Sequence, residues 1–180
     1  MSRANIVRER PAAVGAITIR LNYARRAATL WPSTAGAMKL NPHLSVAFQG
    51  DCEEAFKLYA RCLEGAITFM LTWGQSPMAA DVPAEWGAKI FHATLKIGEA
   101  LMTGADSPPG QYHRPQGFSI VLQMDDAAAA ERVFRTLAEN GNIEMPLQET
   151  FWASRFAALT DRFGIPWTIN CERPADASLT

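Results

Sequence analysis

The 180-residue sequence has no apolar run approaching the roughly 20 residues of a membrane-spanning helix, so we expect a protein that does not cross a membrane. Cysteine is scarce. Cys52, Cys62 and Cys171 are an odd number, and their spacing fits neither a disulfide framework nor a zinc ribbon. We therefore expect three thiols packed as small apolar side chains in a reducing compartment, and a cytoplasmic location.

A strong overall charge is also missing, since the formal net charge is −1. This average hides a division of the chain. Residues 1–37 contain six arginines, no lysine and one glutamate, a net charge of +5, and the remaining residues sum to −6. An acidic folded part lacks the broad basic face that nucleic-acid binding requires, so we expect no nucleic-acid partner.

Residues 1–37 show no sustained helical or strand periodicity. Three interpretations are open: a transit-type targeting peptide, a basic tail that contacts an acidic partner, or an extension upstream of a true start at Met38. We favour the third, because the first well-patterned segment begins just after Met38. Residues 173–180 are expected to be a short tail.

The patterned part begins with an alternating segment, 43–48, which predicts a strand. A helix follows, and we expect Asp51 and Glu54 to form its capping box and Gly65 to end it. Further strands are predicted, at 67–73, 90–97 and 99–104.

The same order of elements then repeats. A second alternating segment, 118–124, leads into a helix that opens at Asp125-Asp126 and closes at Asn140-Gly141. Strands are expected at 143–148, 155–160 and 166–171. The two strand–helix starts, His43 and Phe118, lie 75 residues apart, which predicts an internal duplication. The fold class is therefore α+β, with two βαβββ modules at about 38–106 and 115–172.

Several segments carry a family resemblance. They are Asn41-Pro-His-Leu, Glu54-Ala55 with Tyr59, Ser76-Pro-Met78, His92–Gly98, Leu101-Met102, and Met145-Pro-Leu-Gln-Glu-Thr-Phe-Trp152 followed by Arg155-Phe156, Asp161-Arg-Phe-Gly164 and Trp167. On these residues, positions 38–172 resemble the PhnB-like branch of the vicinal-oxygen-chelate superfamily, which includes glyoxalase I, bleomycin-resistance proteins and extradiol dioxygenases. The resemblance implies a U-shaped mixed sheet around a pocket, a small-molecule ligand and a homodimer.

Catalytic members of that superfamily hold a metal on the first, fourth, fifth and eighth strands. The matching pocket-facing positions here are His43, Thr103, Ser119 and Thr168. One imidazole and three hydroxyls cannot compete with water for Zn²⁺, Ni²⁺ or Fe²⁺, so we predict a pocket without a metal. No Gly-x-Gly-x-Gly turn joins a strand to a helix, and we expect no cofactor.

Two histidines are candidate catalytic groups. His43 and His92 fall on the more polar side of their strands, and either imidazole could act as a general base near neutral pH. The alternative is that each only forms hydrogen bonds with the backbone or a strand neighbour. His113, in a Pro-rich connection, is expected to be solvated.

Trp152 and Arg155 are candidate ligand-binding residues. They lie three residues apart in a segment without regular periodicity, where an indole can stack on a planar ligand and a guanidinium can bind an anion. The alternative is a tryptophan that closes the rim of the sheet and an arginine paired with Glu149 or Asp161.

The sequence thus predicts a PhnB-like protein that binds a small organic molecule in a metal-free pocket. The predicted pocket residues are His43, Thr103, Ser119, Trp152, Arg155 and Thr168. The alternative is a glyoxalase-like enzyme that uses a pocket histidine as general base on a small carbonyl or hydroxy-acid substrate. A purely structural role is a third possibility, and the sequence leaves the question of catalysis open.

Overall fold

The computed structural model describes residues 42–173, which belong to one compact unit of the chain. The interpretations of residues 1–37 lie outside the described residues. Within them, no helix has the length and apolar character needed to cross a bilayer.

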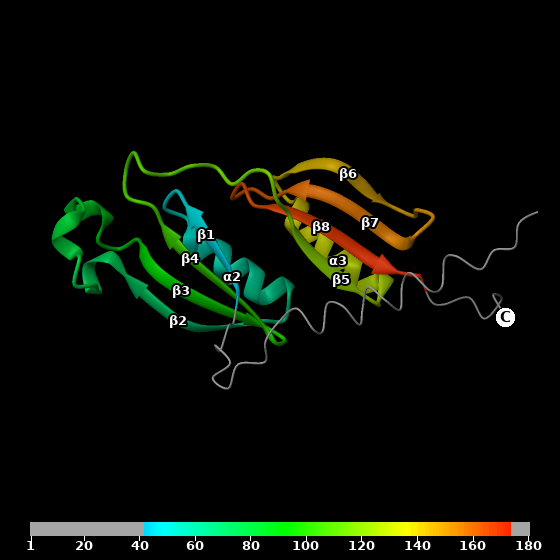
Figure 1. The fold of residues 1–180 in the computed structure, drawn as a ribbon, viewed down its shortest axis with the longest axis horizontal. Coiled ribbons are helices and arrows are strands. Elements are labelled where there is room, and N and C mark those ends of the chain that lie inside the picture. The colour runs from blue at the N-terminus through cyan, green and yellow to red at the C-terminus, as the bar shows by residue number, and fades with distance from the viewer. Residues whose placement is uncertain (1–41, 174–180) are drawn as a thin grey trace, which may run out of the picture. The chain divides into compact units, whose positions relative to one another are not determined.

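The first module is a strand, a helix and three further strands (Figure 1). Its elements are β1 (Leu44–Phe48), α2 (Cys52–Cys62), β2 (Ala66–Thr72), β3 (Ile90–Ile97) and β4 (Ala100–Asp106). Three short 3₁₀ helices, Trp73–Gln75, Ala79–Asp81 and Ala84–Trp86, lie in the connection from β2 to β3. The strands form a mixed sheet in the order β1-β4-β3-β2, in which β1 and β4 are parallel.

The second module repeats this order. Its elements are β5 (Ile120–Met124), α3 (Ala127–Ala138), β6 (Asn142–Gln148), β7 (Ala153–Thr160) and β8 (Pro166–Glu172). The strand order is β5-β8-β7-β6, again with one parallel pair, β5 and β8. The predicted α+β class and the two βαβββ modules are confirmed.

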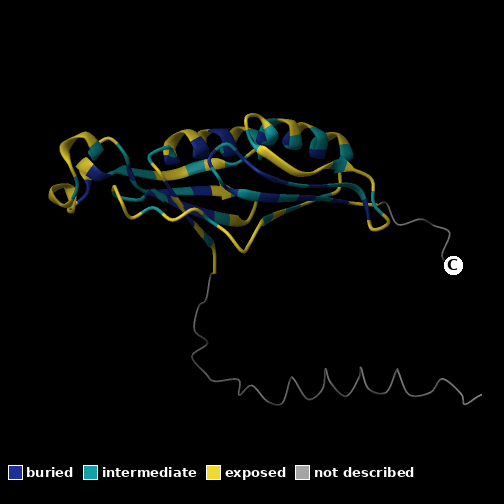
Figure 2. Cartoon of the chain, turned by 90° about the horizontal axis from the view of Figure 1, so that it is seen from above, coloured by how far each residue is buried: buried dark blue, intermediate teal, exposed yellow. Residues whose placement is uncertain are grey.

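Each sheet carries its helix on one face only. Figure 2 shows α2 and α3 on the same side of the two sheets. Alternate strand residues, such as Val46 and Ile169, are buried against the helices, whereas their neighbours face the other side. We call this helix-free side the open face of each sheet.

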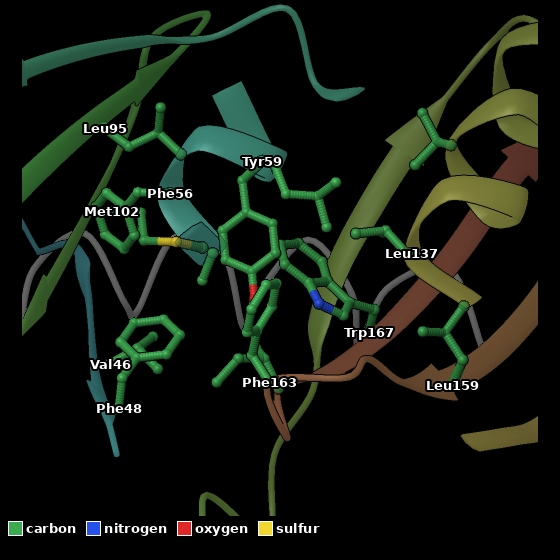
Figure 3. Close-up of a cluster of buried hydrophobic side chains, with 14 of the residues drawn as sticks. Val46, Phe48, Phe56, Tyr59, Leu95, Met102, Leu137, Leu159, Phe163 and Trp167 are labelled. Carbon is green, nitrogen blue, oxygen red and sulfur yellow. The ribbon is translucent and has the colours of Figure 1, made fainter. Parts of the chain in front are cut away.

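A shared core joins the two modules. Tyr59 of α2 packs its ring edge-to-face against Phe163 and Trp167 of the second module, at centroid distances of 6.1 and 5.1 Å. Figure 3 shows Tyr59 between core residues of both modules. The two modules therefore share one continuous core.

The predicted capping box of α2 does not form. Asp51 is the N-cap residue, but its side chain makes no capping hydrogen bond. The buried carboxylate of Asp106 takes this place, accepting from the backbone N–H groups of Gly50 and Cys52 through Oδ1 and from Ile90 through Oδ2. An acceptor 54 residues away in sequence has replaced the local one.

The end of α2 also differs from the prediction. Gly65 was expected to end the helix, yet the positive φ belongs to Glu64, at 52°. In the second module the positive φ belongs to Asn140, at 56°, within the predicted Asn140-Gly141 stop. The glycines that follow are needed for space instead. A Cβ on Gly65 would lie 2.7 Å from the carbonyl oxygen of Lys96, and one on Gly141 would lie 2.6 Å from that of Thr160.

Candidate functional site

The open faces hold most of the polar side chains that the sequence analysis selected. On the first sheet, Ser45 of β1 lies opposite Thr103 of β4, and Thr103 lies opposite Thr94 of β3. The Thr103 hydroxyl is buried and donates to the carbonyl of Leu44 at 3.3 Å. These side chains form a row of hydroxyl groups across the sheet.

One of the two histidines lies on this sheet, and the other lies just before its first strand. His92 is on β3, where Nε2 is 3.3 Å from the Thr94 hydroxyl and the ring lies 5.9 Å from that of Phe69. His43 is exposed and directly precedes β1. Because β4 separates β1 from β3, two interstrand spacings of about 5 Å lie between these strands. The contact between His92 and Thr94 fits the alternative interpretation, in which the imidazole only forms a hydrogen bond with a strand neighbour.

The second sheet brings two predicted pocket residues into contact. Ser119 lies just before β5, and its hydroxyl is 2.9 Å from the Thr168 hydroxyl on β8. Two residues further along β8, Asn170 donates through Nδ2 to Gln123 Oε1 at 2.9 Å. The Asn170 Oδ1 atom is buried and receives no hydrogen bond from any residue in 42–173. It is a free acceptor on this face.

Three aromatic rings stand at one end of these polar groups. Phe156 of β7 lies directly opposite Asn170 in the sheet. Trp152 packs edge-to-face on Phe156 at a centroid distance of 5.3 Å, and Phe151 packs on Trp152 at 4.5 Å. Trp152 remains 46% exposed, so its indole is available to a ligand.

Arg155 does not join this group. Its Nε donates to Glu131 Oε1 of α3 at 3.0 Å, which places the side chain on the helix side of the sheet. The next residue, Phe156, points to the opposite face because side chains alternate along a strand. The prediction that Arg155 and Trp152 bind the same ligand is therefore wrong, because the two side chains lie on opposite sides of the sheet. Arg155 has an ion-pair partner, but it is neither Glu149 nor Asp161; Glu149 pairs with Arg173.

Asn170, Gln123 and Phe156 also belong to this surface, although they were not among the predicted pocket residues. Their positions follow from the same alternation that selected Thr168, since Asn170 lies two residues after it on β8. Gln123 could not be assigned without the β5–β8 register, which sets it opposite Asn170.

The ligand chemistry of the site is that of hydroxyls and amides. Among residues 42–173, no three His, Cys, Asp or Glu side chains lie together as a metal site requires. A metal-free pocket remains a prediction, supported by the donor set: Thr103, Ser119 and Thr168 present neutral hydroxyls, which bind transition metals poorly.

The cysteines are not suited to nucleophilic chemistry. All three are free thiols, and Cys52 and Cys171 are buried. Burial raises the pKa of the Cys62 thiol to about 11, and burial together with the nearby Asp106 charge raises the pKa of Cys52 further. Since the thiolate is the reactive form, Cys52 and Cys62 are unreactive near neutral pH.

Two cavities border the helices, and Val121 and Gln123 of β5 also line the first of them. One, of about 580 Å³, opens between α2, β5 and α3, and none of the six predicted pocket residues lines it. Another, of about 550 Å³, is lined by Glu131, Phe134 and Arg155 among others. Arg155 is the only one of the six predicted pocket residues that lines either cavity. The other five lie on or next to the open faces, and they are His43, Thr103, Ser119, Trp152 and Thr168.

The chain is similar to known proteins along the described part. The family model described as "Glyoxalase/Bleomycin resistance protein/Dioxygenase superfamily" matches residues 42–169. Protein YjdN of Escherichia coli (strain K12) is 36% identical over 141 residues, which cover 74% of this chain and 95% of that protein.

Two solved structures share the fold. The structure of protein PA1353 from Pseudomonas aeruginosa has a TM-score of 0.69 and 42% identity, and the match covers 76% of this chain and all of that one. The PhnB protein from Bacillus cereus has a TM-score of 0.64 at 20% identity, with 73% of this chain and 99% of that chain covered. The second likeness concerns the fold alone.

Proposed function

Because this chain belongs to the glyoxalase/bleomycin resistance protein/dioxygenase superfamily, with the PhnB-like pattern that its sequence predicted, we propose that it binds a small organic molecule on the open faces of its sheets. The binding needs no metal. The ligand contains a planar group that stacks on Trp152, and it carries a hydrogen-bond donor for Asn170.

The observation that carries this proposal is the unpartnered Asn170 Oδ1 opposite Phe156, the ring on which the exposed Trp152 indole packs. A buried acceptor without a donor destabilises the protein by about 1–3 kcal/mol, so a ligand N–H or O–H that reaches it gains affinity. Ser119 and Thr168 add adaptable hydroxyls next to it. Trp152 adds a large apolar surface at the edge.

A homodimer would enclose this site. Large apolar side chains are exposed on the open side of one chain, among them Phe69 (50%), Val121 (55%) and Trp152 (46%). Exposed apolar groups of this size are typical of interaction surfaces. A second copy that covers them would turn two open faces into a pocket, as the U-shaped sheet of the family implies. The three free thiols agree with a reducing, cytoplasmic setting.

Tryptophan fluorescence tests the proposal during a screen of small aromatic and anionic metabolites. Trp152→Ala should weaken binding of a hit by a factor of about 2–10, because it removes one aromatic contact. Asn170→Ala should weaken binding of the same hit by removing the acceptor. Trp86→Phe, in the β2–β3 connection, is the matched control and should leave affinity unchanged.

Two results would oppose the proposal: an affinity that neither Trp152→Ala nor Asn170→Ala changes, or binding that disappears after dialysis against a chelator. Product formation that is lost in His43→Ala or His92→Ala would instead establish the enzymatic alternative, with that imidazole as the general base.

A further inference from the structure

A polar, solvent-open cavity of about 470 Å³ has none of the six predicted pocket residues in its lining. Four connections border it: β1–α2, the β4–β5 linker, α3–β6 and β7–β8. Figure 1 shows the β4–β5 linker crossing from one module to the other. The lining residues are Gln49, Asp51, Tyr112, Arg114, Asn140, Gly141, Asn142, Thr160, Asp161, Arg162, Phe163 and Gly164.

Asp51 is an acidic group of this cavity that forms no ion pair within the described part of the chain. Its Oδ1 is buried and receives no hydrogen bond from any residue between 42 and 173. The capping role that would normally occupy this carboxylate belongs to Asp106, which accepts the Cys52 N–H. Burial raises the pKa of Asp51; backbone hydrogen bonds at Asp51 and Gln49 oppose this effect, and the nearby Asp106 and Glu54 charges add to it. The carboxylate therefore lacks a positive partner.

Arg114 is the corresponding positive group. It comes from the linker and forms no ion pair or hydrogen bond within the described part of the chain. The other arginine of the cavity, Arg162, is already paired with Glu54 and Glu139. Asp161 is likewise occupied, since it accepts four hydrogen bonds. Among the charged residues that line this cavity, Asp51 and Arg114 are the two whose side chains bind no other side chain within residues 42–173.

One glycine of the cavity wall faces the linker. Gly164 lines the cavity without a side chain and has a φ of +83°. A Cβ on Gly164 would lie 3.6 Å from the Tyr112 hydroxyl and 3.7 Å from Arg114 Nε. Both linker side chains thus extend over the β7–β8 turn, where a bound molecule would meet them.

We propose that this cavity is a second binding site, specific for a small zwitterion that places a cationic nitrogen at Asp51 and an acid group at Arg114. The Tyr112 hydroxyl supplies a further hydrogen bond. A simple anion would meet the Asp51 and Asp161 carboxylates, and a simple cation would leave Arg114 unmatched. A molecule with both charges satisfies the two free groups together.

The probes are glycine, β-alanine and γ-aminobutyrate, three amino acids that differ in the distance between ammonium and carboxylate. Butylamine and butyrate, which carry one charge each, are the controls. Binding is measured on the full chain by NMR titration. We expect at least one amino acid to bind at least about tenfold more tightly than either control.

Asp51→Asn and Arg114→Gln should each weaken binding of that amino acid at least about tenfold, because each leaves one ligand charge without its partner. The matched controls are Glu53→Gln, on the exposed side of the first turn of α2, and Arg132→Gln, in the lining of the 580 Å³ cavity. Neither should change the affinity, nor should Trp152→Ala, which alters only the open-face site.

Three results would overturn the proposal: no binding by any of the three amino acids, equal binding by a singly charged control, or unchanged affinity in both Asp51→Asn and Arg114→Gln. Circular dichroism of each variant verifies that it is folded before the affinities are compared.

Discussion

Single carboxylates organise much of this molecule. Asp161, at the end of β7, is 4% exposed and accepts from the Tyr59 hydroxyl at 2.5 Å and from Trp167 Nε1 at 2.8 Å. Its other oxygen accepts the backbone N–H groups of Phe163 and Ile165. Burial and the adjacent Asp161 charge raise the pKa of Tyr59, so its hydroxyl remains a donor near neutral pH. One side chain thus links a helix, a turn and a strand.

Asp161→Ala should therefore lower the free energy of unfolding by roughly 3–5 kcal/mol, because four buried donors lose their acceptor. Tyr59→Phe removes one donor and should reduce it by only about 1.5–3 kcal/mol. Urea unfolding measures both. A loss below about 1 kcal/mol in Asp161→Ala would contradict this role.

The ionised carboxylate of Asp51 should destabilise the folded protein, whereas that of Asp161 stabilises it. The pKa of Asp51 is raised in the folded protein, chiefly by burial and then by Asp106 and Glu54, and its charge also lies near Tyr112. The ionised form is thus disfavoured by folding, so stability is lost as the pH rises through the folded-state pKa.

Asp51→Asn should consequently be more stable than the parent protein at pH 7, and the difference should shrink toward pH 4. Thermal unfolding across this range measures it. A difference that is constant with pH would show that the charge of Asp51 is not responsible.

At the scale of elements, local patterns predicted most of the strands and both helices. Alternation at 43–48 and 166–171 matches β1 and β8 to within a residue or two, since these strands bury one face only. The capping of α2 could not be predicted, because its acceptor, Asp106, comes from β4. The direction of Arg155 depends in the same way on Glu131 of a neighbouring helix, which no local pattern reveals.

The helix ends offer a direct comparison of backbone strain with lack of space. Glu64→Gly should stabilise the protein by up to about 1 kcal/mol, because Glu64 occupies the left-handed region at φ 52°. Gly65→Ala should destabilise it by about 1–3 kcal/mol through its contact with the Lys96 carbonyl. Chemical denaturation distinguishes the two; equal signs would contradict this account.

At the scale of the whole molecule, the proposed homodimer can be tested on the open faces. Val121 is 55% exposed on β5, which is an edge strand of its sheet. If a second copy covers this side, Val121→Glu should shift the protein from dimer to monomer without unfolding it, because a buried carboxylate without a partner opposes association. Light scattering after gel filtration measures the mass. Lys57→Glu, on the exposed side of α2, is the control.

The hydrogen bond between Tyr59 and Asp161 spans 102 residues and joins the two halves of a duplicated sequence. Its donor and acceptor belong to non-equivalent positions, a helix in the first module and the end of a strand in the second. The two modules are therefore not interchangeable, because each supplies a different half of the bond. Surface residues of either module can change without affecting this bond, whereas a change at Tyr59 or Asp161 removes a link between both modules.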